Sequence, residues 1–213
     1  MGGRGAGIKI KTHEDTDILE WYGSGDGMWI NNYLRGLNNE IALTDEELSG
    51  ISRLDKATNE RIKEDTLYRS VDASAIFGKM TQLQYEYLWN YIQDGENALG
   101  KGAYAQKVMA EAKRMANAPL NKIITDKGYM STTTDSAIAE EWGDFTGSSK
   151  PVVLKIKTSK NTRGKDISFL DKNVSEDMAQ KERLLKRGQS YIPKKVYMKN
   201  GNIYVDVSMI WAS

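Results

Sequence analysis

Apolar positions recur with a helical period in the first part of the chain. Residues 26–37 and 103–118 each place apolar side chains three or four positions apart, which predicts amphipathic helices. Thr44 and Thr81 each stand three residues before a Glu or a Gln, which is the capping-box pattern at the start of a helix. We therefore expect four helices here, of which the one that begins after Thr44 runs to about Lys63.

The second part of the chain has the period of β-strands instead. Val152, Leu154 and Ile156 alternate with Lys155 and Lys157. A later segment places Ile203, Val205, Val207, Met209 and Trp211 on one face. This later segment follows Asn200 and Gly201, a pair that is typical of a tight β-hairpin turn. Helices first and strands last favour an α+β fold with antiparallel sheets over a doubly wound parallel sheet. Shorter strands are expected at residues 66–71, 128–134 and 182–185.

Length and composition are those of a globular protein. The 213 residues fit one domain, with 39% hydrophobic and 28% charged residues. A net charge of +1 gives no reason to expect nucleic acid or a membrane surface as partner. No apolar run approaches the ~20 residues that a membrane-spanning helix needs. We expect a glycine-rich flexible leader over residues 1–12 and a single domain over residues 13–213.

Composition also excludes several kinds of chemistry. The chain has no cysteine, and His13 is its one histidine, so thiol nucleophiles, disulfides and multi-histidine metal sites are excluded. Phosphate-loop and nucleophile-elbow motifs are missing as well. The leader lacks the apolar segment of a secretory signal, so we expect the protein to act in a cytosol. That cytosol is either the producing cell's or that of a target cell reached by other machinery.

Three groups of polar residues stand on the predicted strands. Arg69 has apolar and aromatic neighbours, so it either pairs with a structural carboxylate or reaches into a cleft for an anion such as phosphate. Ser131 belongs to a strand rich in hydroxyl groups. Gln180 and Glu182 are two residues apart, and on an extended strand such side chains share one face. Alone, such a pair is more often a solvated strand edge than a site.

Together these segments resemble the arginine, STS and QxE motifs of the mono-ADP-ribosyltransferase toxins. The matching segments are residues 68–69, 128–133 and 180–185, in that order. Residues 31–36 resemble the NxxxR helix of those toxins, and Phe145 resembles the aromatic residue before a central strand. The likeness covers most of the chain and is strongest to clostridial Rho-modifying exoenzymes and to the enzymatic components of binary actin-modifying toxins. It implies two roughly perpendicular antiparallel sheets that form an NAD cleft, with helices at the N-terminal side.

The resemblance assigns roles around the bond between nicotinamide and ribose. Glu182 would hydrogen-bond the ribose 2′-hydroxyl and stabilise the oxocarbenium-like charge that develops as this bond breaks. Arg69 would bind a phosphate of NAD and hold the nicotinamide half of the cleft. Ser131 would orient Glu182, and Thr133 would support the strand. Thr132 alternates to the opposite face, where we expect a structural role.

Residues outside the three motifs would complete the NAD site. Asn31 and Arg35 would hold the pyrophosphate or the adenosine half, and Phe145 would cover the nicotinamide ring by stacking. The family often has an arginine near this aromatic residue. Here Lys150 is the nearest basic residue, and it offers a point charge in place of a guanidinium fork.

Gln180 bears on the choice of acceptor. In the family a Glu at this position accompanies arginine acceptors, and a Gln accompanies asparagine or, in a separate branch, guanine bases of DNA. A glutamine can form a reciprocal amide pair with an asparagine side chain, so a neutral amide on a protein is favoured. Residues 175–179 lack the aromatic that the Rho-modifying exoenzymes carry, so a Rho-type small GTPase is one candidate target among others. Glu176 and Asp177 disfavour a DNA backbone.

The predicted function is mono-ADP-ribosyl transfer from NAD to a protein, by a monomeric toxin or phage effector that needs no metal and hydrolyses NAD as a side activity. One alternative is an enzyme of the same fold that modifies nucleic acid bases. Another is a non-catalytic binding or structural module, against which the joint presence of Arg69, Ser131 and Glu182 speaks. Residues 79–119 form a helical insertion relative to the short exoenzymes, either as a partner-binding surface or as extra scaffold.

Overall fold

The computed structural model describes residues 15–23, 27–37, 42–145, 150–173 and 179–210. The helices are α1 (Asp15–Trp21), α2 (Gly27–Arg35), α3 (Asp45–Ala57), α4 (Ser74–Phe77), α5 (Gln82–Asp94), α6 (Ala103–Asn117) and α7 (Ser136–Phe145), with the short 3-10 helices η2 (Gly95–Asn97) and η3 (Ser168–Asn173). The strands are β1 (Glu60–Arg61), β2 (Thr66–Asp72), β3 (Ile124–Thr125), β4 (Met130–Thr133), β5 (Pro151–Lys157), β6 (Arg163–Asp166), β7 (Glu182–Leu185), β8 (Ser190–Lys199) and β9 (Asn202–Ile210).

Two helices begin with the capping boxes that the sequence predicted. The Thr44 N–H donates to the Glu47 carboxylate at 2.7 Å, and the Thr81 N–H donates to the Gln84 side chain at 2.8 Å. Each threonine hydroxyl accepts the N–H of the same partner residue, at 3.2 Å in both helices. These reciprocal bonds satisfy N–H groups that would otherwise lack a partner at a helix start. They fix where α3 and α5 begin.

Helix α3 ends earlier than predicted, at Ala57 instead of near Lys63. The Thr58 hydroxyl donates to the Leu54 carbonyl at 2.6 Å, a side-chain bond that competes with continued helix. Residues 60–61 then pair with β6 as strand β1. The pairing with a distant strand overrides the local helical pattern.

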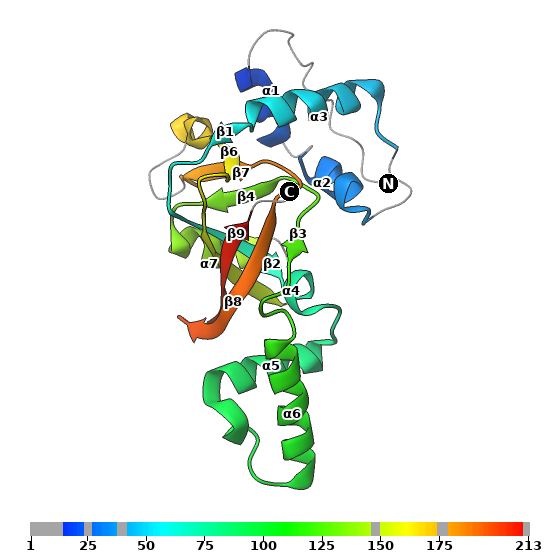
Figure 1. Ribbon diagram of the computed structural model, residues 1–213, viewed down its shortest axis with the longest axis vertical. Coiled ribbons are helices and arrows are strands. Elements are labelled where there is room, and N and C mark those ends of the chain that lie inside the picture. Colours follow the sequence, from blue (N-terminus) through cyan, green and yellow to red (C-terminus); the bar gives the residue numbers. More distant parts are fainter. Residues whose placement is uncertain (1–14, 24–26, 38–41, 146–149, 174–178, 211–213) are drawn as a thin grey trace.

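The strands form one sheet with the order β1-β6-β7-β4-β2-β5-β9-β8-β3. Strand β2 pairs with β5 along its whole length. Its pairing with β4 is limited to one pair of residues, Tyr68 and Thr133. Beyond this junction, β4 and β7 cross the direction of β8 and β9 (Figure 1). The α+β class is therefore confirmed, and the two expected sheets are joined through β2 into one continuous sheet. One detail was wrong: β5 and β9 are parallel, because alternating side chains specify burial and not strand direction.

The predicted hairpin joins β8 and β9. Asn200 and Gly201 have φ values of 51° and 77°, as a type I′ turn requires at its two central residues. The predicted apolar face of β9 is buried from Ile203 to Met209. Trp211, which the pattern also placed on this face, lies outside the described residues.

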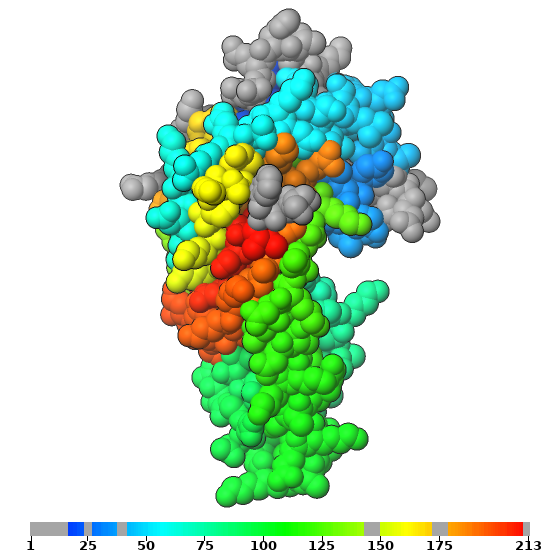
Figure 2. Space-filling model, viewed as in Figure 1, coloured from blue at the N-terminus to red at the C-terminus, as the bar shows by residue number. Residues whose placement is uncertain are grey.

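Three apolar clusters hold the helices to the sheet, and the smallest packs α7 on β5 and β9. The largest joins β2, β5, β8 and β9 to α5 and α6, and its buried members include Leu67, Leu88, Met115, Leu154 and Val205. Helices α5 and α6 extend from the body of the molecule at the end opposite α3 (Figures 1 and 2). They are the helical part of residues 79–119, and their role as an insertion stays a prediction.

The second cluster packs α1, α2 and α3 against β7 and the residue that precedes β4. Its fully buried members include Ile18, Ile30, Leu54, Tyr129 and Leu184. The packing places α2 beside the strands that carry the predicted site. No helix in the described parts of the chain is both long and apolar enough to span a membrane.

Candidate active site

A cavity of about 440 Å³ opens where α1 and α2 face the strands β2, β4 and β7. Four residues that the sequence singled out on separate strands or strand edges line it together. These are Arg69, Ser131, Gln180 and Glu182. The structure therefore joins the three motifs into one site.

Glu182 is the first residue of β7 and pairs with Thr133 of β4. Burial raises the pKa of the Glu182 carboxyl above its ordinary value, and the charge of Asp171 adds to this. A hydrogen bond from Ser131 and the charge of Arg69 lower the pKa in part. The carboxylate is thus desolvated and held by a hydroxyl donor. Such a group can stabilise a developing cation more strongly than one in water.

Arg69 lies on β2 and supplies a donor that the protein does not use. Within the described residues, the buried side-chain atoms that lack a hydrogen-bond partner are Arg69 Nη1 and Ser70 Oγ. Burial lowers the pKa of Arg69, while the charge of Asp126 raises it. A buried guanidinium N–H without a partner is costly, and an anionic ligand would satisfy it.

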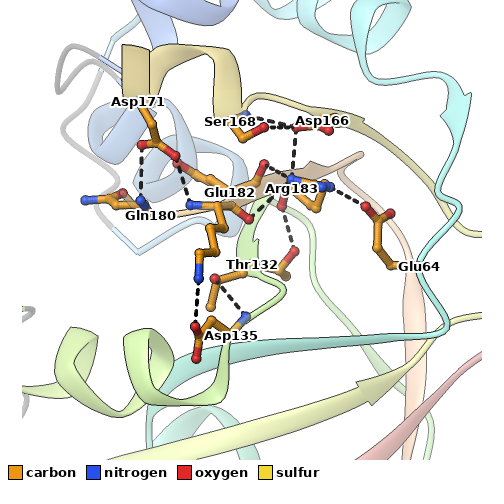
Figure 3. Close-up of polar contacts among 11 residues, drawn as sticks. Glu64, Thr132, Asp135, Asp166, Ser168, Asp171, Gln180, Glu182 and Arg183 are labelled. Atoms are coloured by element: carbon orange, nitrogen blue, oxygen red, sulfur yellow. Dashed lines mark hydrogen bonds and ion pairs between the residues drawn. The ribbon is translucent and has the colours of Figure 1, made fainter. Parts of the chain in front are cut away.

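The backbone before Glu182 is not the extended strand that the sequence predicted. Lys181 has a φ of 49°, and β7 begins only at the next residue. The Asp171 carboxylate accepts the N–H of Gln180 at 3.1 Å and the N–H of Lys181 at 2.9 Å (Figure 3). Gln180 and Glu182 both line the cavity, but a tight bend brings them there and not strand alternation.

Helix α2 lines the cavity with Asn31, which together with Arg35 forms the clamp predicted to hold the pyrophosphate or the adenosine half of NAD. Its side-chain N–H donates to the Tyr22 hydroxyl at 2.6 Å, and its oxygen accepts the Tyr129 N–H at 2.7 Å. Asn31 is only 8% exposed. Its amide therefore joins α2 to the residue that follows α1 and to the residue that precedes β4, in addition to any contact with a ligand.

Arg35, the second residue of the clamp, is also engaged within the protein. Its guanidinium forms a two-bond ion pair with Asp126, at 2.8 and 2.9 Å, and donates to the Tyr129 carbonyl at 3.0 Å. It lines this cavity and a neighbouring cavity of about 840 Å³, which also shares Arg69 and Ser70. The two cavities thus meet at a pair of arginines.

Gly128 lies where the clamp packs on the chain before β4. An added Cβ would come within 2.6 Å of Asn31 Oδ1 and 2.9 Å of Arg35 Nε. Gly128→Ala should therefore lower the free energy of unfolding by about 1–3 kcal/mol, as overpacking does. Thermal and urea unfolding measure this. Gly102→Ala is the control, because nothing lies within 4 Å of its added Cβ, and equal effects of the two would contradict the close packing.

The remaining predicted residues do not line the first cavity. Thr133 is fully buried and its hydroxyl accepts the Asp135 N–H at 3.1 Å, so it supports the strand. The Thr132 hydroxyl donates to the Arg183 carbonyl at 2.6 Å, in line with the structural role expected for it (Figure 3). Phe145 is the last residue of α7, and its side chain lies outside the described part of the structure.

Sequence reasoning missed other residues of the cavity. Tyr22 and Trp142 line it, but neither α1 nor α7 was predicted, so no pattern placed them near the strands. Tyr22 contacts the site closely enough that its pKa, raised by burial, responds to the charges of Arg69 and Glu182. No motif in the sequence singled out Asp171. In the described residues, no three His, Cys, Asp or Glu side chains gather to hold a metal ion.

Solved structures with the same arrangement of elements are ADP-ribosyltransferases, and they define the fold as the ADP-ribosyltransferase fold. C3larvin toxin from Paenibacillus larvae is 21% identical, with a TM-score of 0.58, and the match covers 95% of this chain and 90% of that one. C3stau2 from S. aureus, solved with NAD, is 21% identical with a TM-score of 0.62, covering 97% and 92%. BECa of a C. perfringens binary enterotoxin, solved with NADH, is 18% identical with a TM-score of 0.62, covering 95% and 44%.

The family model of the ADP-ribosyltransferase exoenzymes matches residues 6–210, and the chain belongs to that family. No curated protein matches the chain in sequence. The family uses NAD as substrate, and its function is toxin-like mono-ADP-ribosyl transfer, in general to proteins.

Proposed function

We propose that this cavity breaks the nicotinamide–ribose bond of NAD and transfers ADP-ribose to an amide side chain of a protein. The observation that carries the proposal is the meeting of Arg69, Ser131 and Glu182 in one cavity, with a buried Arg69 donor left unpaired. A structural arginine would have its donors satisfied. An unpaired one beside a desolvated carboxylate suits a ligand that carries both phosphate and developing positive charge.

Glu182 acts on the ribose. Its ionised carboxylate accepts a hydrogen bond from the 2′-hydroxyl and stabilises the oxocarbenium-like centre as the bonding electrons leave with nicotinamide. Ser131 donates to the carboxylate and limits its orientations. Because burial raises the pKa of Glu182, the activity should fall on acidification from a higher pH than an exposed glutamate would give.

Arg69 and the second cavity receive the rest of NAD. Arg69 lines both cavities, so a phosphate bound there connects the ribose at Glu182 with the adenosine half in the larger cavity. Arg35 lines both as well, but its ion pair with Asp126 means that it would have to share its donors with a phosphate. The main phosphate contact is therefore assigned to Arg69.

Gln180 selects the acceptor. Its side chain is exposed at the rim of the cavity, where an incoming protein would meet it. An amide can donate to and accept from an asparagine side chain at once, which favours a neutral acceptor. A Rho-type small GTPase is one candidate, and a toxin or phage effector acting in a cytosol is the proposed role. Water in place of the acceptor gives ADP-ribose and nicotinamide, the expected side reaction.

Gln180→Glu separates acceptor choice from bond cleavage. Transfer to the wild-type acceptor should fall about tenfold, because a carboxylate cannot donate to the amide oxygen of the acceptor and leaves it unpaired, which costs about 1–3 kcal/mol. Nicotinamide release in the absence of acceptor should change by only a few fold. Labelled NAD with a eukaryotic cell lysate measures the first, and nicotinamide release measures the second. Equal loss of both would show that Gln180 acts in cleavage and not in acceptor choice.

A further inference from the structure

Asp171 holds the backbone that carries the two motif residues. Each oxygen of its carboxylate accepts one N–H, from Gln180 at 3.1 Å and from Lys181 at 2.9 Å (Figure 3). Lys181 lies in the left-handed backbone region, with a φ of 49°, which an L-residue adopts only when its surroundings hold it there. A second bond, from Lys181 Nζ to Asp135 at 3.0 Å, holds the side chain of the same residue.

The carboxylate stands on a well-anchored element. Helix η3 begins where Asp166 accepts the N–H and the hydroxyl of Ser168, at 3.0 and 2.7 Å. The N–H of Ile167, the residue before η3, donates to the Glu182 carbonyl at 3.1 Å. This bond joins the start of the helix to the start of β7. Leu170 packs against the apolar cluster under α1 and α3. Asp171 is therefore fixed relative to Glu182 before any ligand arrives.

We infer that Asp171 is a positioning residue of the transfer reaction, which sets the bend at Gln180 and Lys181 so that the acceptor-facing amide and the catalytic carboxylate converge on one cavity. The inference rests on the proposed function of that cavity. Glu182 has further backbone support, from its pairing with Thr133 and from the Ile167 N–H. Gln180 lies outside the strand, so losing the Asp171 carboxylate should disturb Gln180 more than Glu182.

The charge of Asp171 acts on the same site. The groups that face Glu182 are Asp171 from η3, Arg69 from β2, Ser131 from β4 and Tyr22 directly after α1. Of these, Asp171 is the one whose negative charge disfavours ionisation of Glu182. Removing this charge while keeping an oxygen acceptor, as in Asp171→Asn, should therefore lower the pKa of Glu182.

Hydrogen exchange and activity test the positioning role together. In Asp171→Ala, the backbone amides of Gln180 and Lys181 should exchange at least tenfold faster, with protection of β4 and β7 unchanged. Protein labelling from NAD in a cell lysate should fall at least tenfold, and acceptor-free nicotinamide release at most threefold. Asp94→Ala, which removes an exposed aspartate of α5 away from these two amides, should leave the amide exchange and the ratio of the two activities unchanged. Unaltered exchange in Asp171→Ala, or parallel loss of both activities, would overturn the inference.

The titration of Glu182 gives a readout that needs no catalysis. Carbon-13 NMR of the Glu182 carboxyl should show a lower pKa in Asp171→Asn than in wild type, and the acid limb of nicotinamide release should move the same way. An unchanged Glu182 pKa would contradict the electrostatic part of the inference. If wild type released no nicotinamide but the exchange and titration results held, the proposed function would fail while the positioning of Gln180 by Asp171 stood.

Discussion

Replacing Glu182 with Gln is expected to lower NAD cleavage and ADP-ribosyl transfer by about 10²–10³-fold, equivalent to ~3–4 kcal/mol of transition-state stabilisation. The amide is nearly isosteric, so NAD can still enter the cavity. It has no negative charge to offer the developing cation at the ribose. Nicotinamide release and protein labelling should fall together, because both follow from the same bond cleavage. The control is Glu141→Gln, an exposed glutamate of α7, which should behave as wild type.

The same substitution is expected to stabilise the fold at neutral pH. Because the folded-state pKa of Glu182 is raised above its ordinary value of 4.5, its contribution to stability is full below that value and is lost as the pH rises through the folded-state pKa. Glu182→Gln should therefore have a higher Tm than wild type at pH 7, with a smaller difference near pH 4. A lower Tm for the variant at pH 7 would contradict the desolvated state of the carboxylate.

Replacing Arg69 with Lys is expected to weaken NAD binding and cleavage by about ten- to 150-fold, the range of ~1.5–3 kcal/mol for a hydrogen bond to a charged group. Lys keeps the charge but loses the planar fork that can reach a phosphate with two N–H groups. The measurement is the KM for NAD in nicotinamide release, together with the thermal shift that NAD produces. Arg61→Lys, an exposed arginine on β1, is the matched control.

Arg69→Met tests whether the arginine is present for ligand or for fold. It keeps the aliphatic length and removes a buried donor that has no partner. Without NAD this variant should therefore unfold at a temperature no lower than that of wild type, although it should lose NAD binding. Destabilisation of several kcal/mol would instead show that Arg69 is present for the fold.

Local chemistry made most of the elements predictable. The capping boxes at Thr44 and Thr81 and the turn at Asn200 and Gly201 appear in the structure as the sequence predicted, because each depends on residues close together in the chain. The end of α3, the parallel pairing of β5 with β9 and the short edge strands depend on distant partners. A pattern within one segment carries no information about those partners.

The candidate site divides in the same way. The order of the motifs was enough to predict that Arg69, Ser131, Gln180 and Glu182 share one cavity, and the structure places all four there. It gave no sign of the bend at Lys181, because the Asp171 carboxylate that holds the bend acts through backbone N–H groups, which look alike in every sequence. The engagement of Arg35 by Asp126 was hidden for a related reason, since the two residues are 91 positions apart.

The most direct test of the central claim is the identity of the modified residue. Isotopically labelled NAD is incubated with a eukaryotic cell lysate and either wild type or Glu182→Gln, and mass spectrometry locates the label. We expect ADP-ribose on an asparagine or another amide side chain of a protein with wild type, and loss of that label by about 10²–10³-fold with the variant. Label mainly on arginine or on nucleic acid bases, or equal labelling by the two enzymes, would contradict the account.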